Sequence, residues 1–461
     1  MPLSTDSDLT GLGRGLFMFT FRKVLSPFCV LCLLCAFAVS TLRAQSVGFV
    51  YVTNAGGNSG AAAGSISAYS IDRQTGGLLP VPGSPFADPG GPWSIAVDPK
   101  NRFAYIANRG DNTISAYAIG GTGALTPVPG SPFPQDPTAS GELPVSVAVD
   151  PAGKFVFVAN YNYRTVRAYQ IDQNTGALTQ APGSPFPAGT NPQSVTVDLS
   201  GKFVYVASGY HNANGTVSAY TIEQSNGSLT PIPGSPFTVP TDRSKTGFPA
   251  PGTMPCSVTV HAIATGQALY VADSFQNDIW QYVIEGATGA LALSPTSPFS
   301  VPGGPYSVKA NSSGPFIYAS NSYPSYPTGS VAGYTIDAVS GSLTAVPGSP
   351  FLAGTVPVGV AVDPAGRFVF TANQGSDLTN YSGTVSVYTV DANTGALTPV
   401  SGSPFAAGPE PTSIATAPDR IPGAGARQRR KGPNGPAKGR TNANPPTPLF
   451  AGIRPSGNPD E

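Results

Sequence analysis

The 461 residues include 24 basic and 24 acidic side chains, so the formal net charge is zero, and only 10% of the residues are charged. Typical soluble domains carry about 25% charged residues, so uncharged polar groups must hydrate much of this surface. Binding to nucleic acid requires clustered Lys and Arg side chains that neutralise phosphates. The composition therefore excludes an ordinary nucleic-acid-binding protein, and we expect no nucleic-acid partner.

Residues 1–44 have the pattern of a secretory signal. Basic residues precede an apolar run from Phe28 to Val39, and Ala44 offers a cleavage point. The run is shorter than the ~20 residues that a spanning helix needs, although the large Leu42 near the cut leaves an uncleaved anchor as the alternative. We expect a secreted, periplasmic or cell-envelope protein, attached to a membrane only through this segment. The mature chain then keeps only Cys256 and forms no intrachain disulfide.

A tetrapeptide, Gly-Ser-Pro-Phe, recurs along the rest of the chain. Six copies are identical and a seventh, Thr296–Phe299, differs at one position, with successive copies 47 to 62 residues apart. A period near 50 residues that occurs seven times is typical of a β-propeller, in which each repeat forms one blade. The identical copies are Gly83–Phe86, Gly130–Phe133, Gly183–Phe186, Gly234–Phe237, Gly348–Phe351 and Gly402–Phe405.

Each repeat contains four short apolar runs bounded by turn residues, which predict four antiparallel strands per blade, named a to d in chain order. The repeat region opens on a b run at Phe49–Asn54 and closes on an a run at Pro411–Pro418. These two fragments complete one blade. We therefore predict an all-β, seven-bladed β-propeller over residues 45–418, with four-stranded blades and a ring closed by strands from both termini.

Several residue types recur in every repeat or nearly so. Asp begins the a–b and c–d connections, for example at Asp150 and Asp172, and each c run carries a tyrosine. A residue that recurs in each blade is expected to form turns or to pack blade against blade, whereas a functional site breaks the symmetry. We interpret these residues as structural, and we expect His261, which stands where other repeats have Asp, to be a turn residue as well.

Residues 419–461 differ in kind from the repeats. They are rich in Pro and Gly, carry 8 basic and 3 acidic side chains, and have no apolar period. This composition predicts a disordered tail. The basic run at 427–431 is expected to be solvated, with contact to an anionic surface as the alternative.

The repeats resemble the lactonase family of seven-bladed propellers over residues 46–418, and Phe-Val-Tyr-Val-Thr-Asn at 49–54 is similar to the signature of the related YVTN propellers. Characterised family members hydrolyse 6-phosphogluconolactone or form a muconate lactone. The resemblance implies a His-x-His pattern on an a strand, with arginines and a glutamate nearby. The a runs of this sequence have no histidine there, so the resemblance supplies no catalytic residues, and we expect no cofactor and no metal.

The two faces of the predicted ring differ in regularity. The a–b and c–d turns form a uniform face, which we call the turn face. The b–c and d–a connections emerge on the opposite face, the loop face, where the repeats disagree. Binding residues concentrate in irregular loops on rigid scaffolds. We therefore expect a ligand site on the loop face, at the mouth of the central channel, with the alternative that its tyrosines only brace the loops. The candidate residues are Arg109, Tyr161, Tyr163, Arg164, Tyr210, His211 and Tyr323.

From these observations we expect a monomeric binding or scaffold module whose partner is an extracellular polymer, such as a glycan, or a protein. Two alternatives remain open. The first is a divergent lactonase with a site unlike that of the family. The second is a structural component of the cell envelope.

Overall fold

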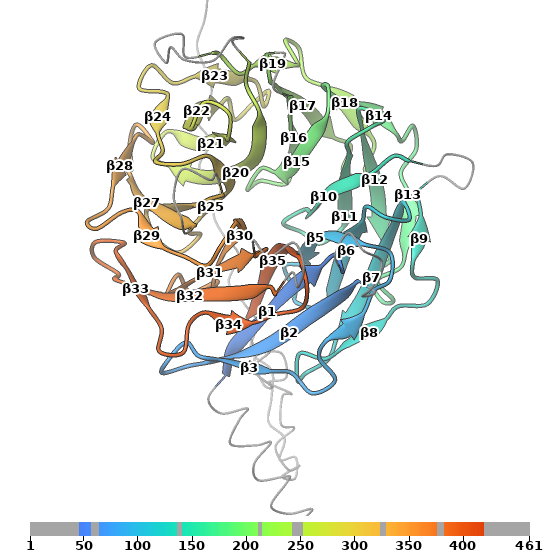
Figure 1. Ribbon diagram of the computed structural model, residues 1–461. Coiled ribbons are helices and arrows are strands. Elements are labelled where there is room, and N and C mark those ends of the chain that lie inside the picture. Colours follow the sequence, from blue (N-terminus) through green and yellow to red (C-terminus); the bar gives the residue numbers. More distant parts are fainter. Residues whose placement is uncertain are drawn as a thin grey trace, which may run out of the picture. The chain divides into compact units, whose positions relative to one another are not determined.

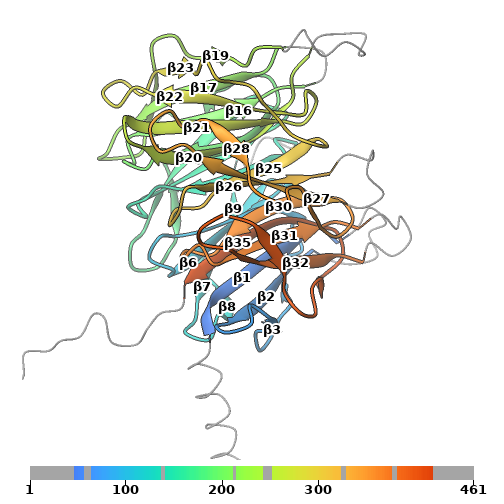
Figure 2. The same ribbon diagram turned by 90° about the vertical axis from the view of Figure 1, so that its left-hand side faces the viewer.

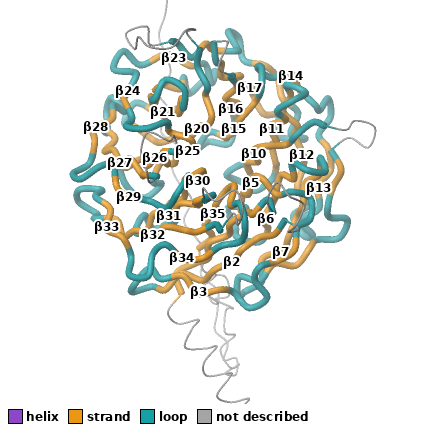
Figure 3. Tube along the Cα trace, viewed as in Figure 1, coloured by secondary structure: helices purple, strands orange, loops and turns teal. Residues whose placement is uncertain are grey.

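The computed structural model describes residues 46–56, 64–135, 141–210, 214–241, 252–322, 329–375 and 382–418. Within these ranges the regular secondary structure consists entirely of β-strands. They form seven antiparallel sheets around a central axis (Figures 1, 2 and 3). The predicted all-β, seven-bladed propeller is confirmed. The predicted signal segment and the predicted tail lie outside the described residues.

In each blade, strand a lies next to the axis and strand d at the rim (Figure 1). Blade 1 combines the last strand of the chain with the first four, and blades 2 to 7 follow in chain order. The a strands are β5 (Pro92–Val97), β10 (Pro144–Val149), β15 (Pro192–Val197), β20 (Pro255–Ile263), β25 (Pro305–Ala310), β30 (Pro357–Val362) and β35 (Pro411–Pro418). The b strands are β1 (Ser46–Asn54), β6 (Phe103–Asn108), β11 (Phe155–Asn160), β16 (Phe203–Ser208), β21 (Gly266–Asp273), β26 (Phe316–Asn321) and β31 (Phe368–Asn373).

The outer half of each blade consists of one continuous strand c and a strand d in two pieces. The c strands are β2 (Ser65–Asp72), β7 (Thr113–Ile119), β12 (Thr165–Ile171), β17 (Thr216–Ile222), β22 (Asp278–Ile284), β27 (Ser330–Ile336) and β32 (Thr384–Val390). The d strands are β3 (Leu78–Pro80) with β4 (Phe86–Ala87), β8 (Leu125–Pro127) with β9 (Phe133–Pro134), β13 (Leu178–Gln180) with β14 (Phe186–Pro187), β18 (Leu229–Pro231) with β19 (Phe237–Thr238), β23 (Leu291–Leu293) with β24 (Phe299–Ser300), β28 (Leu343–Ala345) with β29 (Phe351–Leu352), and β33 (Leu397–Pro399) with β34 (Phe405–Ala406).

The recurring tetrapeptide explains why strand d is divided. Its Gly-Ser-Pro part loops out of the strand, and Gly83 at φ 90° takes a backbone conformation that favours glycine. The loop would leave one N–H of strand c without a partner. In all seven blades the serine hydroxyl oxygen accepts this N–H at 2.8–3.1 Å, as Ser131 does from Ala116. The serine therefore takes the place of a backbone acceptor at the rim of each blade.

The ring is closed by pairing between the two ends of the propeller. Strands β1 and β35 run antiparallel, from Gly48 opposite Pro418 to Asn54 opposite Pro411. This pairing buries Ile414, which is 7% exposed, and it removes the free edge that either strand would present alone. The predicted closure by strands from both termini is confirmed.

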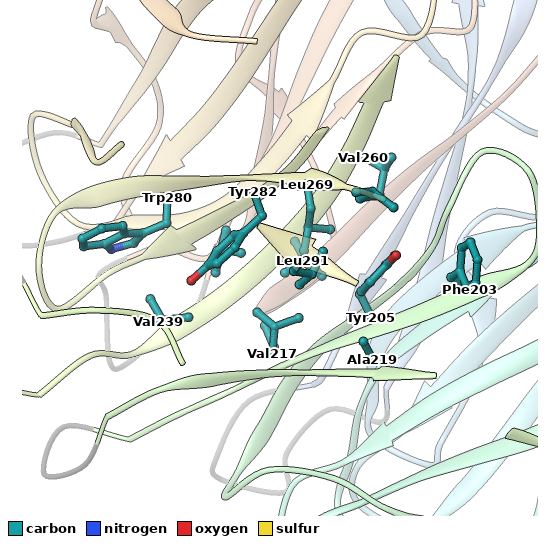
Figure 4. Close-up of a cluster of buried hydrophobic side chains, with 14 of the residues drawn as sticks. Phe203, Tyr205, Val217, Ala219, Val239, Val260, Leu269, Trp280, Tyr282 and Leu291 are labelled. Atoms are coloured by element: carbon teal, nitrogen blue, oxygen red, sulfur yellow. The ribbon is translucent and has the colours of Figure 1, made fainter. Parts of the chain in front are cut away.

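The hydrophobic core is divided among the blade interfaces. Seven clusters of buried side chains are present in the described residues, and each combines residues of two adjacent blades. Figure 4 shows one of them, in which Tyr205 and Val217 of blade 4 face Leu269 and Tyr282 of blade 5. A blade therefore buries its apolar side chains only when both neighbours are present.

The recurring tyrosines also join neighbouring blades through hydrogen bonds. On strand c, the Tyr117 hydroxyl donates to the Ala87 carbonyl of the preceding blade at 3.0 Å. Tyr69 makes the same bond across the closure, to Ala406 at 2.6 Å. On strand b, the Tyr105 hydroxyl donates to Gly176 of the following blade at 3.1 Å. The interpretation of the c-strand tyrosines as packing residues is confirmed.

The aspartates of the connections accept hydrogen bonds from their own turns. Asp150 accepts N–H bonds from Ala152 at 3.0 Å and from Phe155 at 2.6 Å. Asp172 accepts from Asn174 and Thr175, and these bonds lower the pKa of its carboxyl. The prediction that these aspartates are turn residues is confirmed.

The expectation for His261 is wrong. Blade 5 has no Asp-Pro turn after its a strand, so β20 and β21 continue to pair until Ile263 lies opposite Gly266. His261 is therefore a strand residue, paired with Ala268. In the described part of the chain, no helix is long and apolar enough to cross a membrane.

Shortening the chain from its C-terminus tests the closure. A chain that ends at Gly408 lacks β35, and we expect its free energy of unfolding to fall by at least about 3 kcal/mol, because Ile414 and its neighbours lose their buried contacts. A chain that ends at Asp419 keeps β35 and should unfold like the full-length protein. Thermal and urea unfolding compare the three chains. Equal stability of the two shortened chains would contradict closure by β35.

The rim serine is tested by Ser131→Ala. This change leaves the buried Ala116 N–H without its acceptor, which should cost about 1–3 kcal/mol of stability in urea unfolding. Thr126→Ala, at an exposed position of β8 in the same blade, is the matched control and should cost much less. A Ser131→Ala protein as stable as the control would show that the hydroxyl is dispensable.

Candidate functional site

The second and third residues of the a strands surround a cavity of about 110 Å³ on the axis. The a strands begin where the d–a connections end, so this cavity lies at the loop-face end of the channel. We call it the loop-face mouth. Its lining residues are Trp93, Ser94, Val145, Ser146, Gln193, Ser194, Cys256, Ser257, Tyr306, Ser307, Val358, Thr412 and Ser413.

Six of the seven blades contribute a serine to this lining, and the seventh has Gly359 in its place. In five of these serines the hydroxyl oxygen accepts an N–H from the next a strand at 3.1–3.4 Å, as Ser146 does from Val195. These bonds join the inner strands around the ring. A hydroxyl that accepts one bond still has its own proton to donate. The serines therefore form a ring of hydroxyl donors around the mouth.

A cation lies against the aromatic wall of the mouth. Arg109 directly follows β6, and its guanidinium carbon lies 4.4 Å from the centre of the Trp93 ring. Its backbone N–H donates to Gly91 at 3.0 Å, which holds the b–c loop against the start of β5. A guanidinium stacked on an indole keeps its N–H edge available for oxygen acceptors. Arg109 is therefore positioned to recognise a carboxylate or carbonyl oxygen.

Three tyrosines from other blades take part in the electrostatic interactions around Arg109. Tyr306 and Tyr161 interact with the guanidinium, and Tyr210 interacts with Tyr161. Burial raises the pKa of Tyr306, the Cys256 thiol and Tyr161 raise it further, and Arg109 opposes them. Burial also raises the pKa of Tyr161, together with Tyr210, whereas Asn191 and Arg109 lower it. Both phenols therefore remain protonated at neutral pH and can donate hydrogen bonds. These interactions indicate that Tyr210 and Arg109 both lie near Tyr161 on the loop face.

The thiol at the mouth is not activated. Cys256 donates to the Pro305 carbonyl at 3.0 Å, and burial raises its pKa to about 12, with a further increase from Asp273. The thiol is therefore protonated and a poor nucleophile at neutral pH. Burial also raises the pKa of Asp273 to about 6, but this carboxyl is 0% exposed and does not line the mouth. Among the described residues, no group of His, Cys, Asp and Glu could hold a metal ion.

Blade 3 departs from the repeat directly beneath the predicted Tyr161 loop. Its c strand has Arg167 where most blades have a small residue, and the guanidinium pairs with Glu142 at 2.5 and 2.9 Å, both side chains being buried. Glu142 also accepts from Asn160 at 3.0 Å. The backbone N–H of Tyr161 donates to the carbonyl of Leu143, the residue after Glu142, at 3.0 Å. The buried Glu142–Arg167 pair therefore lies next to the start of the b–c loop that contains Tyr161.

The structure brings some of the predicted site residues together and does not describe others. Arg109, Tyr161 and Tyr210 belong to one electrostatic group. Tyr163, which is 49% exposed, and Arg164 lie in the same loop as Tyr161. His211 and Tyr323 lie outside the described residues.

Sequence reasoning missed the residues on the a strands. Trp93, Gln193, Cys256, Tyr306 and Thr412 all occupy the second position of their strand, between an invariant proline and a position that is serine in six blades. Variation at that one position, inside an otherwise regular run, was the signal that could have identified them.

Comparison with known proteins identifies the family and structures of similar fold. The family model described as a seven-bladed β-propeller lactonase matches residues 39–303 and 304–416. The comparison with curated proteins found no match. A periplasmic gluconolactonase from Pseudomonas aeruginosa has 18% identity and a TM-score of 0.60, over 81% of this chain and 100% of that chain. A proposed 6-phosphogluconolactonase from Bacteroides fragilis has 20% identity and a TM-score of 0.60, over 81% and 98% of the two chains.

Identities of this size show a shared fold alone. The family match, however, extends over most of the chain and covers all seven blades. The resemblance inferred from the repeats is therefore confirmed, and the chain belongs to the lactonase family of seven-bladed β-propellers.

Proposed function

We propose that the loop-face mouth binds a sugar acid or sugar lactone, either free or as the end unit of a glycan. The observation that carries this proposal is the Arg109 guanidinium, stacked on Trp93 beside a ring of serine hydroxyls. A sugar acid offers a carboxylate to the guanidinium and hydroxyl groups to the serines. The arrangement matches the chemistry of such a ligand in both charge and hydrogen bonding.

The size of the mouth limits how the ligand binds. Its volume of about 110 Å³ is below the roughly 300–1,000 Å³ of pockets that enclose a whole small ligand. The ligand therefore enters with one end, and the remainder lies against the rim. Tyr210, which is 46% exposed, and Tyr161 offer aromatic surface there at a small cost in conformational entropy. This geometry suits a terminal sugar unit of a longer polymer.

The same proposal includes the compartment. Residues 1–44 have the pattern of a secretory signal, and a structurally similar protein from Pseudomonas aeruginosa is described as periplasmic. A secreted or periplasmic binding module would meet sugar acids as free metabolites or in envelope polymers. Either source fits the chemistry of Arg109 and the serine ring.

Lactone hydrolysis is the second candidate, and family membership favours it. Arg109 and the serine hydroxyls could stabilise the oxyanion that forms when water attacks a lactone carbonyl. Attack by water also needs a general base. Among the described residues, the ionisable side chains that line the mouth are a protonated thiol and a protonated phenol. We therefore place binding ahead of catalysis.

The binding proposal is tested by titrating the full chain with D-gluconate in a calorimeter. Arg109→Met removes the charged donor and should weaken binding about 10- to 100-fold, because hydrogen bonds to charged groups contribute roughly 1.5–3 kcal/mol. Arg73→Met, an exposed change at a c–d turn on the other face, is the matched control and should bind like the wild type. Equal loss in both variants, or no loss in either, would refute a role for the mouth.

The catalytic alternative is tested by following hydrolysis of 6-phosphogluconolactone. We expect rates close to the spontaneous background, because none of the described residues that line the mouth is a base at neutral pH. Turnover far above background that disappears in Arg109→Met would make the protein a lactonase and reverse the order of the two candidates.

A further inference from the structure

The central channel continues beyond the serine ring toward the turn face. There two adjoining cavities, of about 350 and 330 Å³, are lined by the fourth to sixth residues of the a strands and by the turns that follow. No residue that lines them also lines the loop-face mouth. We call the two cavities together the turn-face cavity. It is a separate site, larger than the mouth and of different chemistry.

Most of the side chains that line the turn-face cavity are apolar, although strand backbone and three threonines also contribute polar groups to its larger part. Val147, Val195, Val260 and Ile414 line its larger part. The fifth residue of each a strand leaves room on the axis because it is small in six blades. These six small residues are Ala96, Ala148, Thr196, Thr259, Ala361 and Ala415.

Lys309 occupies the fifth position in the remaining blade. It is the one ionisable side chain in the described lining of the larger cavity, and it also lines the smaller one. Its side chain is in contact with the channel solvent. The side chain is exposed to the channel, and partial desolvation by the surrounding wall lowers the pKa of its amine. The repeat symmetry is thus broken by a cation that lines both cavities.

Other charged groups leave this cation unneutralised. Among the described residues, no carboxylate forms an ion pair with the Lys309 ammonium. Asp98, Asp198 and Asp363 begin a–b turns of other blades and accept hydrogen bonds from the backbone of their own turns. Asp198 also accepts one from the Gln267 amide at 3.0 Å. Burial lowers the pKa of His261, at the outer end of the cavity, so this imidazole is neutral at pH 7. An anion from outside can therefore pair with the Lys309 ammonium without displacing a carboxylate of the described residues.

We propose that the turn-face cavity binds a small carboxylate with a hydrocarbon tail, such as a medium-chain fatty acid. The carboxylate pairs with the Lys309 ammonium, and the tail lies against the valine and isoleucine side chains of the a strands. The site is independent of the proposed sugar-acid site at the other end of the channel.

The probe for this proposal is octanoate, titrated into the full chain by calorimetry. The wild type should bind octanoate, and Lys309→Met, which keeps the length and apolar character of the side chain, should weaken binding about 10- to 100-fold. Lys309→Arg keeps the charge and should retain affinity within a few-fold. Octanol, which has the tail without the charge, should bind weakly and equally to the wild type and to Lys309→Met.

A second variant tests the cavity without altering the charge. Ala148→Leu places a larger side chain in the lining of the cavity and should reduce octanoate affinity while Lys309 remains. Thermal unfolding of each variant without ligand shows whether it is folded. Equal octanoate affinity of wild type and Lys309→Met would overturn the proposal, as would failure of the wild type to bind millimolar octanoate. Loss of gluconate binding in Arg109→Met, with octanoate binding intact, would separate the two sites.

Discussion

The whole structure depends on apolar surface that is shared between adjacent blades. Each of the seven clusters draws its side chains from two sheets, and the described blades have no separate core of their own. A strand order that left one interface open would expose a complete cluster to water. The pairing of β1 with β35 prevents this, because it makes the first and last blades neighbours. Stability is therefore a property of the closed ring.

Hydrogen bonds between blades give the ring a defined geometry in addition to burial. The Tyr117 hydroxyl bonds backward to Ala87, and Tyr105 bonds forward to Gly176, so one blade is joined to both of its neighbours. Near the axis, hydroxyls such as that of Ser146 join successive a strands. Five such bonds connect neighbouring inner strands in the described residues. They hold the groups that line the channel in place, which favours recognition by preformed groups.

The same regularity makes departures from it informative. Lys309 and Trp93 each replace residues that are small or variable in the other blades, and both face the channel. The Glu142–Arg167 pair replaces a small residue beneath the Tyr161 loop. Substitutions of this kind add nothing to a repeat that already packs well. They give the two ends of one channel different chemistry, with serine donors at the loop face and one cation among valine and isoleucine side chains at the turn face.

The sequence by itself determined the number of blades, the four strands of each blade and the closure of the ring, because period, alternation and turn residues are local properties of the chain. It also identified Arg109, Tyr161 and Tyr210 as loop residues of one face. Only the tertiary structure revealed that the second position of the a strands lines a mouth, that Trp93 stacks on Arg109, and that Lys309 lines two adjoining cavities. These features depend on seven strands, distant in sequence, that meet at one axis. No single repeat contains that information, because each blade contributes only a few residues to each end of the channel.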